Sequence, residues 1–286
     1  MSILNAVYIS RRPAIAFVVV GIFWGCFAAY VPHIKAQLDV SDAMFGTLLL
    51  GSASGLVSSM WLAPMLDRKL GARALQVGII ALSLAWLIPG VMTTPLAFAI
   101  ALTFVGLASG LLDVIMNARV SMLESLTGKS LMNANHAMFS VGYAAAAIIV
   151  AITREAGLPP APVFAGFGVL CCALVPFVRM EVTDIAADDD AAHARYPLWP
   201  IIICGAIVLV AFMSEATVEA WSALHLERTL HGGAAEGAFG PAMLGITMAV
   251  GRFSGQAVAA RWREVTVVIG ASVVSAIGAV IAAVAP

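Results

Sequence analysis

Nine apolar stretches, separated by short polar segments, follow one another along the chain. They cover residues 13–33, 43–66, 73–92, 95–118, 132–153, 160–179, 198–224, 238–260 and 264–285. Each is close to the ~20 residues that a helix needs to cross a bilayer. Because a spanning segment of this length satisfies its backbone inside lipid only as a helix, the pattern predicts an all-α integral membrane protein, a helical bundle with nine crossings.

Composition agrees with this prediction. The 286 residues are 62% hydrophobic and only 11% charged, whereas soluble domains carry about 25% charged residues. We therefore expect the lipid bilayer as the main surroundings of the chain. The net charge of -1, with no long basic stretch, argues against nucleic acid as a partner. The four cysteines all lie in apolar runs and show no metal-binding spacing, so we expect neither a metal nor a cofactor.

The basic residues divide unequally between the two sides of the predicted bundle. Three of them fall on one side, at Lys35, Arg154 and Arg228, and Arg252 lies within a helix. Cytoplasmic loops are enriched in Lys and Arg. This asymmetry predicts a multi-pass protein of the cell inner (plasma) membrane with a cytoplasmic N-terminus. The eleven residues on the predicted cytoplasmic side are Arg11, Arg12, Arg68, Lys69, Arg73, Arg119, Lys129, Arg179, Arg195, Arg261 and Arg263.

One pattern of Phe and Gly residues occurs twice in the sequence. Phe45-Gly46 and Phe239-Gly240 are 194 residues apart, and Gly51 and Gly245 keep the same offset. The repeat predicts a six-helix bundle over residues 1–180, an acidic cytoplasmic linker over 181–197, and an incomplete copy of the bundle, with three helices, over 198–286. A complete second copy would extend to roughly residue 380 by this repeat. We therefore expect a two-half protein truncated after its ninth helix.

Small residues gather on the second and fourth apolar segments. Gly51, Ser52 and Gly55 give the second segment a face on which another backbone can approach closely. Gly106 and Gly110 do the same for the fourth segment. Faces of this kind are typical of tightly packed membrane helices.

Two basic turns carry a resemblance to a known family. Asp67-Arg68-Lys69-Leu70-Gly71-Ala72-Arg73 follows the second segment, and Arg261-Trp262-Arg263 follows the eighth, which contains Gly251-Arg252-Phe253-Ser254-Gly255. Together with the two halves and the long central loop, these motifs resemble the major facilitator superfamily. The first turn has one extra residue before Gly71, and Ala260 stands where the family's second turn has an Asp.

The resemblance implies a secondary transporter that alternates access by rocking its two halves about a central site. It also implies a gating role for the turns. In this hypothesis Asp67 pairs with basic residues across the cytoplasmic mouth; the alternative is a basic membrane anchor with an incidental acid. The predicted gating residues are Asp67, Arg68, Lys69, Gly71, Arg73, Arg261 and Arg263.

Charged residues inside the predicted helices mark a candidate transport site, because burying a charge in lipid is costly. Glu215 on the seventh segment and Arg252 on the eighth lie on successive antiparallel helices, with backbones roughly 10 Å apart in depth. Arg252 stays charged, whereas a desolvated glutamate can take up a proton. The pair therefore suits proton symport or antiport; a static ion pair is the alternative. Glu219, one turn from Glu215, is more typical of an interface residue beside Trp221.

Other polar positions give weaker predictions. Asp113 either caps its helix at the interface or lines a cavity, and Asn117, one turn away, either binds a polar solute or joins helices. Trp24 is a candidate cavity residue in the first segment. His136 more simply satisfies a local hydrogen bond. The predicted substrate and proton pathway is thus Glu215, Arg252, Asp113, Asn117 and Trp24.

Two functions from different classes remain. The first is a proton-coupled carrier of a small organic solute, sugar-like by resemblance or a cationic drug-like compound, with the solute and protons as its partners. The second is a truncated membrane fragment that does not transport, or a subunit that requires a partner. The sequence has no phosphate-binding loop, zinc spacing or nucleophile elbow, so we do not expect an enzyme.

Overall fold

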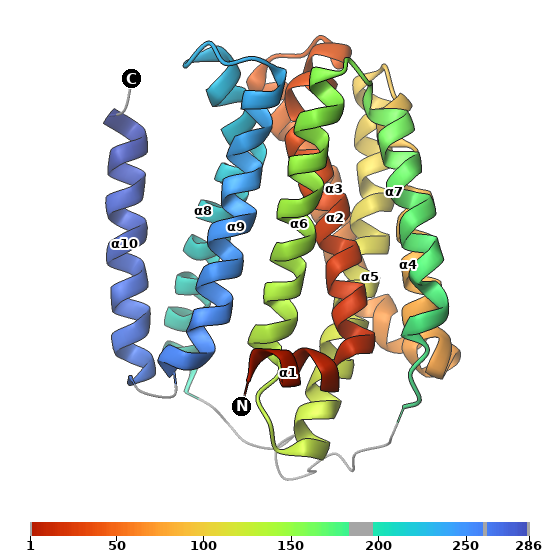
Figure 1. Cartoon of the computed structure of the whole chain (residues 1–286), viewed down its shortest axis with the longest axis vertical. Helices are drawn as coiled ribbons and strands as arrows, with labels where there is room; N and C mark the ends of the chain where they lie inside the picture. The colour runs from red at the N-terminus through yellow and green to blue at the C-terminus, as the bar shows by residue number, and fades with distance from the viewer. Residues whose placement is uncertain (1, 183–196, 260–261, 285–286) are drawn as a thin grey trace.

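The computed structural model describes residues 2–182, 197–259 and 262–284, and within these ranges the chain forms helices and no strand. This confirms the predicted all-α fold. Most of the chain lies in long helices that follow one another (Figure 1). The α-helices are α1 (Ile3–Ile9), α2 (Arg11–Leu38), α3 (Asp42–Leu70), α4 (Ala74–Ala85), α5 (Pro95–Thr127), α6 (Met132–Glu155), α7 (Pro160–Leu174), α8 (Leu198–Arg228), α9 (Ala234–Ala259) and α10 (Glu264–Val284). Short 3-10 helices are η1 (Gly71–Arg73), η2 (Pro89–Val91) and η3 (Val175–Val178).

The long helices stand side by side, while α1 lies across the bundle at one end (Figure 1). We call this end the α1 end and the opposite one the far end. Seven stretches within the described residues are long and apolar enough to cross a membrane. One of them, Asp42–Val91, is 50 residues long and contains both α3 and α4, which are separated by the turn at η1. The 26-residue helix α9 lies among the long helices although it is not one of the seven.

Local sequence explains where several helices begin and end. The Ser41 side chain accepts a hydrogen bond from the Met44 N–H and caps the start of α3. Pro95 and Pro160 occupy the first positions of α5 and α7, where a missing N–H costs nothing. Helix α5 ends at Gly128, whose φ of +65° is the left-handed conformation that glycine adopts without strain.

Two predicted boundaries are wrong. The first apolar stretch was predicted to end at residue 33, but α2 continues to Leu38 with Pro32 inside it. A helix in a bilayer extends into the polar interface, so the apolar run marks only its central part. The third stretch was predicted to run from 73 to 92, but its regular helix ends at Ala85 and gives way to η2, which begins at Pro89.

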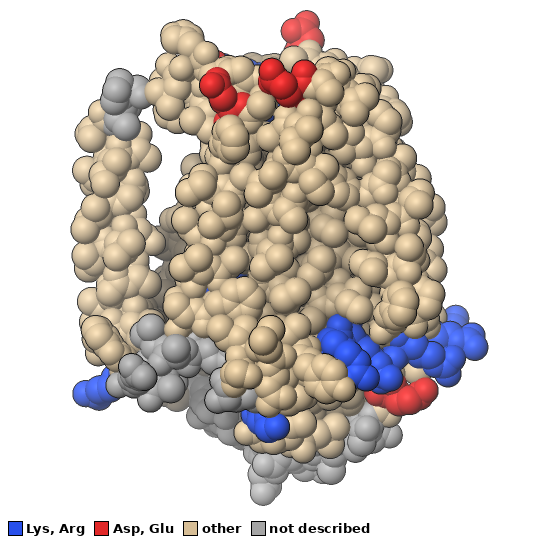
Figure 2. Space-filling model, viewed as in Figure 1, with Lys and Arg blue, Asp and Glu red and all other residues tan. Residues whose placement is uncertain are grey.

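Burial differs sharply along the chain. In the most apolar window of α2, 83% of residues are buried inside the protein, whereas in those of α8 and α10 none are. Helix α2 is therefore the central helix of the bundle, and its apolar surface contacts other helices. The apolar surfaces of α8 and α10 face outward. Most charges on the face shown in Figure 2 lie at the two ends, with an uncharged band between them that matches the bilayer core.

Helices α3 and α5 pack with their backbones almost touching. A Cβ atom added to Gly55 would collide with the backbone of Thr103, and one added to Gly106 would collide with that of Ser52. The two predicted small-residue faces thus meet each other. The same close approach joins α2 to α6, where a Cβ on Gly25 would collide with the Tyr143 backbone. These contacts make the first helices a tightly packed unit.

The last three helices join this unit through α9. Helix α9 packs along α6, with Gly245 against Ala144, and α8 packs on α9 and α2. Helices α3 and α9 both run from the far end toward the α1 end (Figure 1), which is the polarity that the 194-residue repeat requires. The division into a six-helix half and a partial copy stays a prediction. The predicted acidic linker lies mostly outside the described residues, at 183–196.

Candidate functional site

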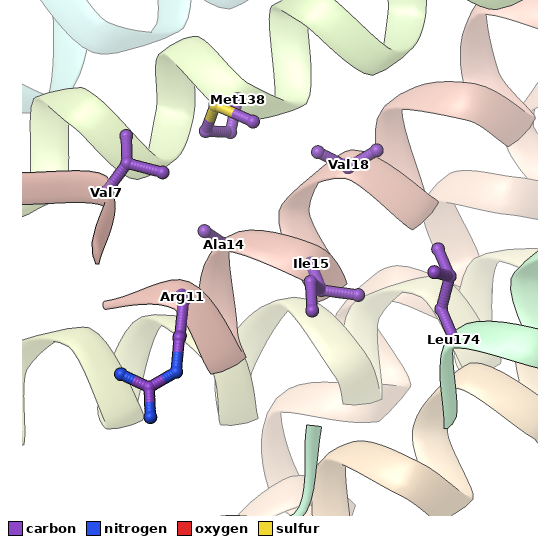
Figure 3. A pocket seen from close by; sticks show the side chains of 7 residues that line it. All are labelled: Val7, Arg11, Ala14, Ile15, Val18, Met138 and Leu174. Carbon is purple, nitrogen blue, oxygen red and sulfur yellow. The ribbon is translucent and has the colours of Figure 1, made fainter. Parts of the chain in front are cut away.

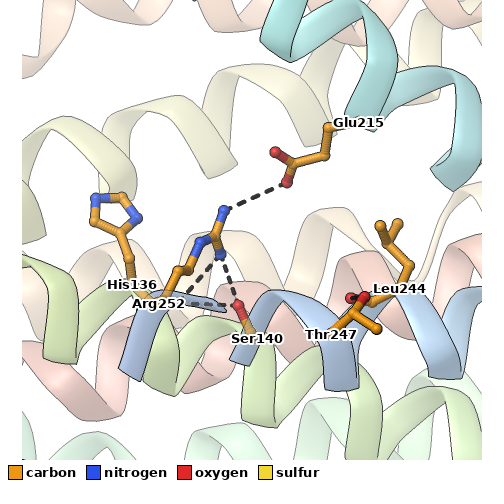
Figure 4. A network of polar contacts seen from close by, with 6 residues as sticks. All are labelled: His136, Ser140, Glu215, Leu244, Thr247 and Arg252. Carbon is orange, nitrogen blue, oxygen red and sulfur yellow. Dashed lines mark hydrogen bonds and ion pairs between the residues drawn. The ribbon is translucent and has the colours of Figure 1, made fainter. Parts of the chain in front are cut away.

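Arg252 is the centre of a polar cluster between α6, α8 and α9 (Figure 4). One terminal nitrogen of its guanidinium donates to the Ser140 hydroxyl at 2.7 Å and to the His136 carbonyl at 3.2 Å. The other lies 3.5 Å from a carboxylate oxygen of Glu215. The guanidinium also lies over the ring of Phe139, 5.6 Å from its centroid. Arg252 therefore links three helices through one planar group.

The structure brings Glu215 and Arg252 together, as their depths in the sequence predicted. Their side chains are 35% and 27% exposed, so the pair is neither sealed in the core nor fully open. Glu219 lies one turn further along α8, close enough to interact electrostatically with Glu215 and with Tyr143 on α6. The His136 ring packs edge-on against Phe17, with centroids 4.9 Å apart, and only its backbone contacts Arg252.

Arg252 lies nearer to the α1 end of the bundle than to the far end. Helix α9 begins at Ala234, four residues before the predicted segment, and Arg252 lies seven residues before its end at Ala259. By the helical rise this is about 10 Å from the end of the helix. Ser140 lies eight residues from the start of α6, at a matching height. The Arg252 cluster therefore lies in the half of the bundle next to the α1 end.

The other three predicted pathway residues are held elsewhere. The Trp24 indole donates to the Ser109 hydroxyl at 3.1 Å and packs edge-on against Trp86, 5.3 Å away. The Asn117 side chain donates to the backbone carbonyl of Asp113 at 2.8 Å and to its carboxylate at 3.2 Å. Trp24 thus joins α2 to α5, and Asp113 and Asn117 bind each other within α5.

The predicted gating turn contains a different ion pair from the one expected. Both carboxylate oxygens of Asp67 accept from Arg119 on α5, one of them at 2.9 Å, and Arg119 also donates to the Gly71 carbonyl at 3.3 Å. Arg119 is only 3% exposed. Gly71 has a φ of +52°, which favours glycine at the point where α3 ends. The pair therefore ties the turn at the end of α3 to α5, the helix against which α3 packs.

The described basic residues of the two predicted gating turns are exposed. Arg68, Lys69, Arg73 and Arg263 are all exposed. Arg261 lies outside the described residues. A gating role for these residues stays a prediction.

A second ionic cluster, which sequence reasoning missed, lies at the far end. Arg154 at the end of α6 pairs with Glu227 of α8 at 2.7 Å and donates to the Ala29 carbonyl of α2 at 2.9 Å. Asp42 at the start of α3 accepts from Lys35 of α2 and from Arg228 of α8, each at 2.8 Å. These contacts connect α8 to three of the first six helices. We call this set the far-end cluster.

The sequence held a signal for this cluster. Lys35, Arg154 and Arg228 are the three basic residues that the charge count placed on the sparsely basic side. All three form ion pairs there. A basic residue that departs from the charge bias needs a local partner, and this requirement points to the carboxylates nearby. Arg119 gave no such signal, because it lies among other basic residues and 52 positions from Asp67.

These observations define a multi-pass helical membrane protein with ionic groups between its helices. Comparison with known proteins identifies the family: the model of the Major Facilitator Superfamily matches residues 14–286, and the chain belongs to this superfamily of transporters. An uncharacterized MFS-type transporter of Yersinia pestis is 31% identical over 94% of this chain and 70% of its own length. An uncharacterized transporter of Sinorhizobium fredii is 29% identical over 90% of this chain and 69% of its own. The membrane protein MosC of Rhizobium meliloti is 25% identical over 86% of this chain and 60% of its own.

Proposed function

We propose that this protein is a proton-coupled carrier of a small organic solute that works by alternating access, with its α1 end in the cytoplasm. Membership of the superfamily supports transmembrane transport. The excess of Lys and Arg at the α1 end supports the orientation. The observation that carries the proton coupling is Arg252, which is shared between a glutamate on α8 and neutral acceptors on α6.

The coupling follows from the charges around Arg252. While Glu215 is ionised, its carboxylate balances the guanidinium and holds α8 beside α9. When Glu215 takes up a proton, Arg252 keeps only neutral partners, the Ser140 hydroxyl and the His136 carbonyl on α6. The balance of contacts between α6, α8 and α9 changes with that single proton. A solute that binds near the same groups changes these interhelical contacts again. Movement of the proton is thereby coupled to movement of the solute.

Proton flux in proteoliposomes tests this function. Solute added to vesicles containing the protein should drive proton movement, and Glu215→Gln should abolish it because the amide cannot release a proton. The matched control is Glu155→Gln, an exposed glutamate at the end of α6, which should transport like the wild type. Solute transport with unchanged proton flux in Glu215→Gln would remove Glu215 from the mechanism.

The solute class is open to a direct comparison. The resemblance suggests hydroxyl-bearing compounds such as sugars, while the acidic pair Glu215 and Glu219 suits a cationic drug-like compound. A panel of neutral sugars and lipophilic cations, each tested for solute-dependent proton flux, separates the two. If Glu219→Gln reduces the flux driven by cations and leaves that driven by sugars unchanged, the Glu219 carboxylate takes part in binding a cationic solute.

A further inference from the structure

A groove at the α1 end carries an inference beyond transport. It lies between α1, α2, α6 and α7 and encloses 180 Å³ (Figure 3). Six of its seven lining residues are apolar, and the seventh is Arg11. Val7 comes from α1, Met138 from α6 and Leu174 from α7, while Ala14, Ile15 and Val18 form its wall on α2. A hydrocarbon chain is the ligand that such a lining accepts.

The groove is a built feature, because α1 is fixed in place. Ser10, between α1 and α2, donates from its hydroxyl to the Ala6 carbonyl at 2.9 Å and accepts from the Asn135 amide of α6 at 2.8 Å. Both Ser10 and Asn135 are fully buried. Leu4 and Tyr8, one turn apart on α1, are 83% and 67% exposed. A helix that lies across the bundle with such residues outward belongs in the membrane interface.

Arg11 lines the groove, and Arg12 follows it directly on α2. Arg11 donates to the Tyr8 carbonyl at 3.5 Å, and its guanidinium lies over the Tyr8 ring at 5.1 Å. Arg12 is exposed beside it and lines a second cavity of 70 Å³ with Arg11, Pro13, Leu123 and Met180. Within the described parts of the chain, neither arginine forms an ion pair. The start of α2, at the edge of the groove, therefore carries two adjacent exposed positive charges that no ion pair among the described residues neutralises.

We propose that this groove binds an anionic phospholipid of the leaflet at the α1 end. One acyl chain lies along the apolar wall of α2, and the phosphate lies between Arg11 and Arg12. Charge complementarity favours this occupant, because basic pockets between membrane helices bind anionic headgroups. The position favours it too, since the guanidinium groups lie at the height of α1, where headgroups are found. The proposal does not depend on proton coupling or on the solute.

Native mass spectrometry of the detergent-solubilised protein tests the charge requirement. Phosphatidylglycerol should bind more tightly than phosphatidylcholine with the same acyl chains. Each arginine near a headgroup contributes about a fivefold gain in affinity. Arg11→Gln with Arg12→Gln should therefore weaken phosphatidylglycerol binding about thirtyfold. The control is Lys129→Gln, which removes an exposed positive charge from the α5–α6 connection and should leave binding unchanged. Equal binding of the two lipids, or no loss in the double variant, would overturn the proposal.

A second variant tests the acyl-chain part. Met138→Trp keeps both arginines but fills the groove, so it should reduce binding as strongly as the double arginine variant. Leu174→Trp, at the α7 side of the groove, repeats the test if Met138→Trp fails to elute as a folded species. Unchanged binding in a folded variant of either kind would overturn the groove as the site. Complete displacement of phosphatidylglycerol by inorganic phosphate would also overturn the proposal, because it would show that the two arginines bind a free anion.

Discussion

The two ends of the bundle hold their helices with different kinds of ion pair. At the α1 end, Arg119 and Asp67 connect α5 to α3, two helices that already pack backbone to backbone. At the far end, Arg154 and Glu227 connect α6 to α8, and Asp42 joins α2, α3 and α8 through Lys35 and Arg228. One pair reinforces a rigid unit, whereas the far-end cluster links that unit to the helices that follow it. In the proposed alternating access, rocking that opens the far end breaks the Arg154–Glu227 and Arg228–Asp42 pairs and can leave the Arg119–Asp67 pair intact.

The largest effect is expected at Arg119. Arg119→Gln leaves the Asp67 carboxylate without its charged partner beside a buried surface, and breaking a buried ion pair costs about 3–5 kcal/mol. The variant should lose folded protein and unfold at a clearly lower temperature in detergent, as measured by size-exclusion chromatography after heating. Adding Asp67→Asn should recover part of that loss. An unchanged unfolding temperature in Arg119→Gln would show that the Arg119–Asp67 pair does not contribute to the stability of the folded protein.

The packing of α9 against α6 can be tested without substituting a charged residue. A Cβ added to Gly245 would lie 2.7 Å from the Ala144 nitrogen, so Gly245→Val forces α9 away from α6 at a cost of about 1–3 kcal/mol. We expect loss of transport with retained membrane insertion. Gly251→Ala is the control on the same helix, because a Cβ there meets nothing within 4 Å. Equal transport by the two variants would argue against tight packing of α9 on α6.

Arg154 tests whether the far-end cluster holds that end closed. Ser222→Cys on α8 provides a reporter, since the Ser222 hydroxyl is buried. With the exposed Cys172 and Cys204 replaced by serine, a membrane-impermeant maleimide should react about fivefold faster when Arg154→Gln is added. The swap Arg154→Glu with Glu227→Arg should restore slow labelling. Faster labelling that persists in the swap would point to a packing defect and not to the ion pair.

Arg228 should give the smallest effect of the four. It is 49% exposed and its partner Asp42 is 58% exposed, so solvent screens the pair and its contribution to holding the far end is small. When Arg228→Gln is added to the Ser222→Cys reporter, maleimide should therefore label the introduced cysteine at a rate close to that of the reporter alone. Adding 1 M salt should remove the remaining difference in labelling rate. A change as large as that of Arg154→Gln would mean that the two pairs act as one network.

Sequence reasoning found the long helices and one of the three ionic groupings. Apolar stretches of spanning length placed the long helices, and depth along successive antiparallel helices brought Glu215 to Arg252. The partners of Asp67 and of Arg154 depend on which helices pack together. A hydropathy pattern does not contain that information, because an apolar helix is suited to many neighbours. Trp24 looked like a cavity residue for the same reason, whereas its neighbours Ser109 and Trp86 come from helices that only the fold brings together.

Arg252 contacts α6 near one end of that helix, whereas the ion pair of Arg154 lies near the other end. The Arg252 guanidinium holds α6 at Ser140, and Arg154 follows 14 residues later on the same helix. That length is a lever arm of about 21 Å, so a tilt of about 10° around Ser140 displaces the far end of α6 by about 4 Å. The ion pair between Arg154 and Glu227, now 2.7 Å long, does not survive such a displacement. In the proposed rocking motion, a small rotation about Ser140 therefore breaks the ion pair at the opposite end of α6.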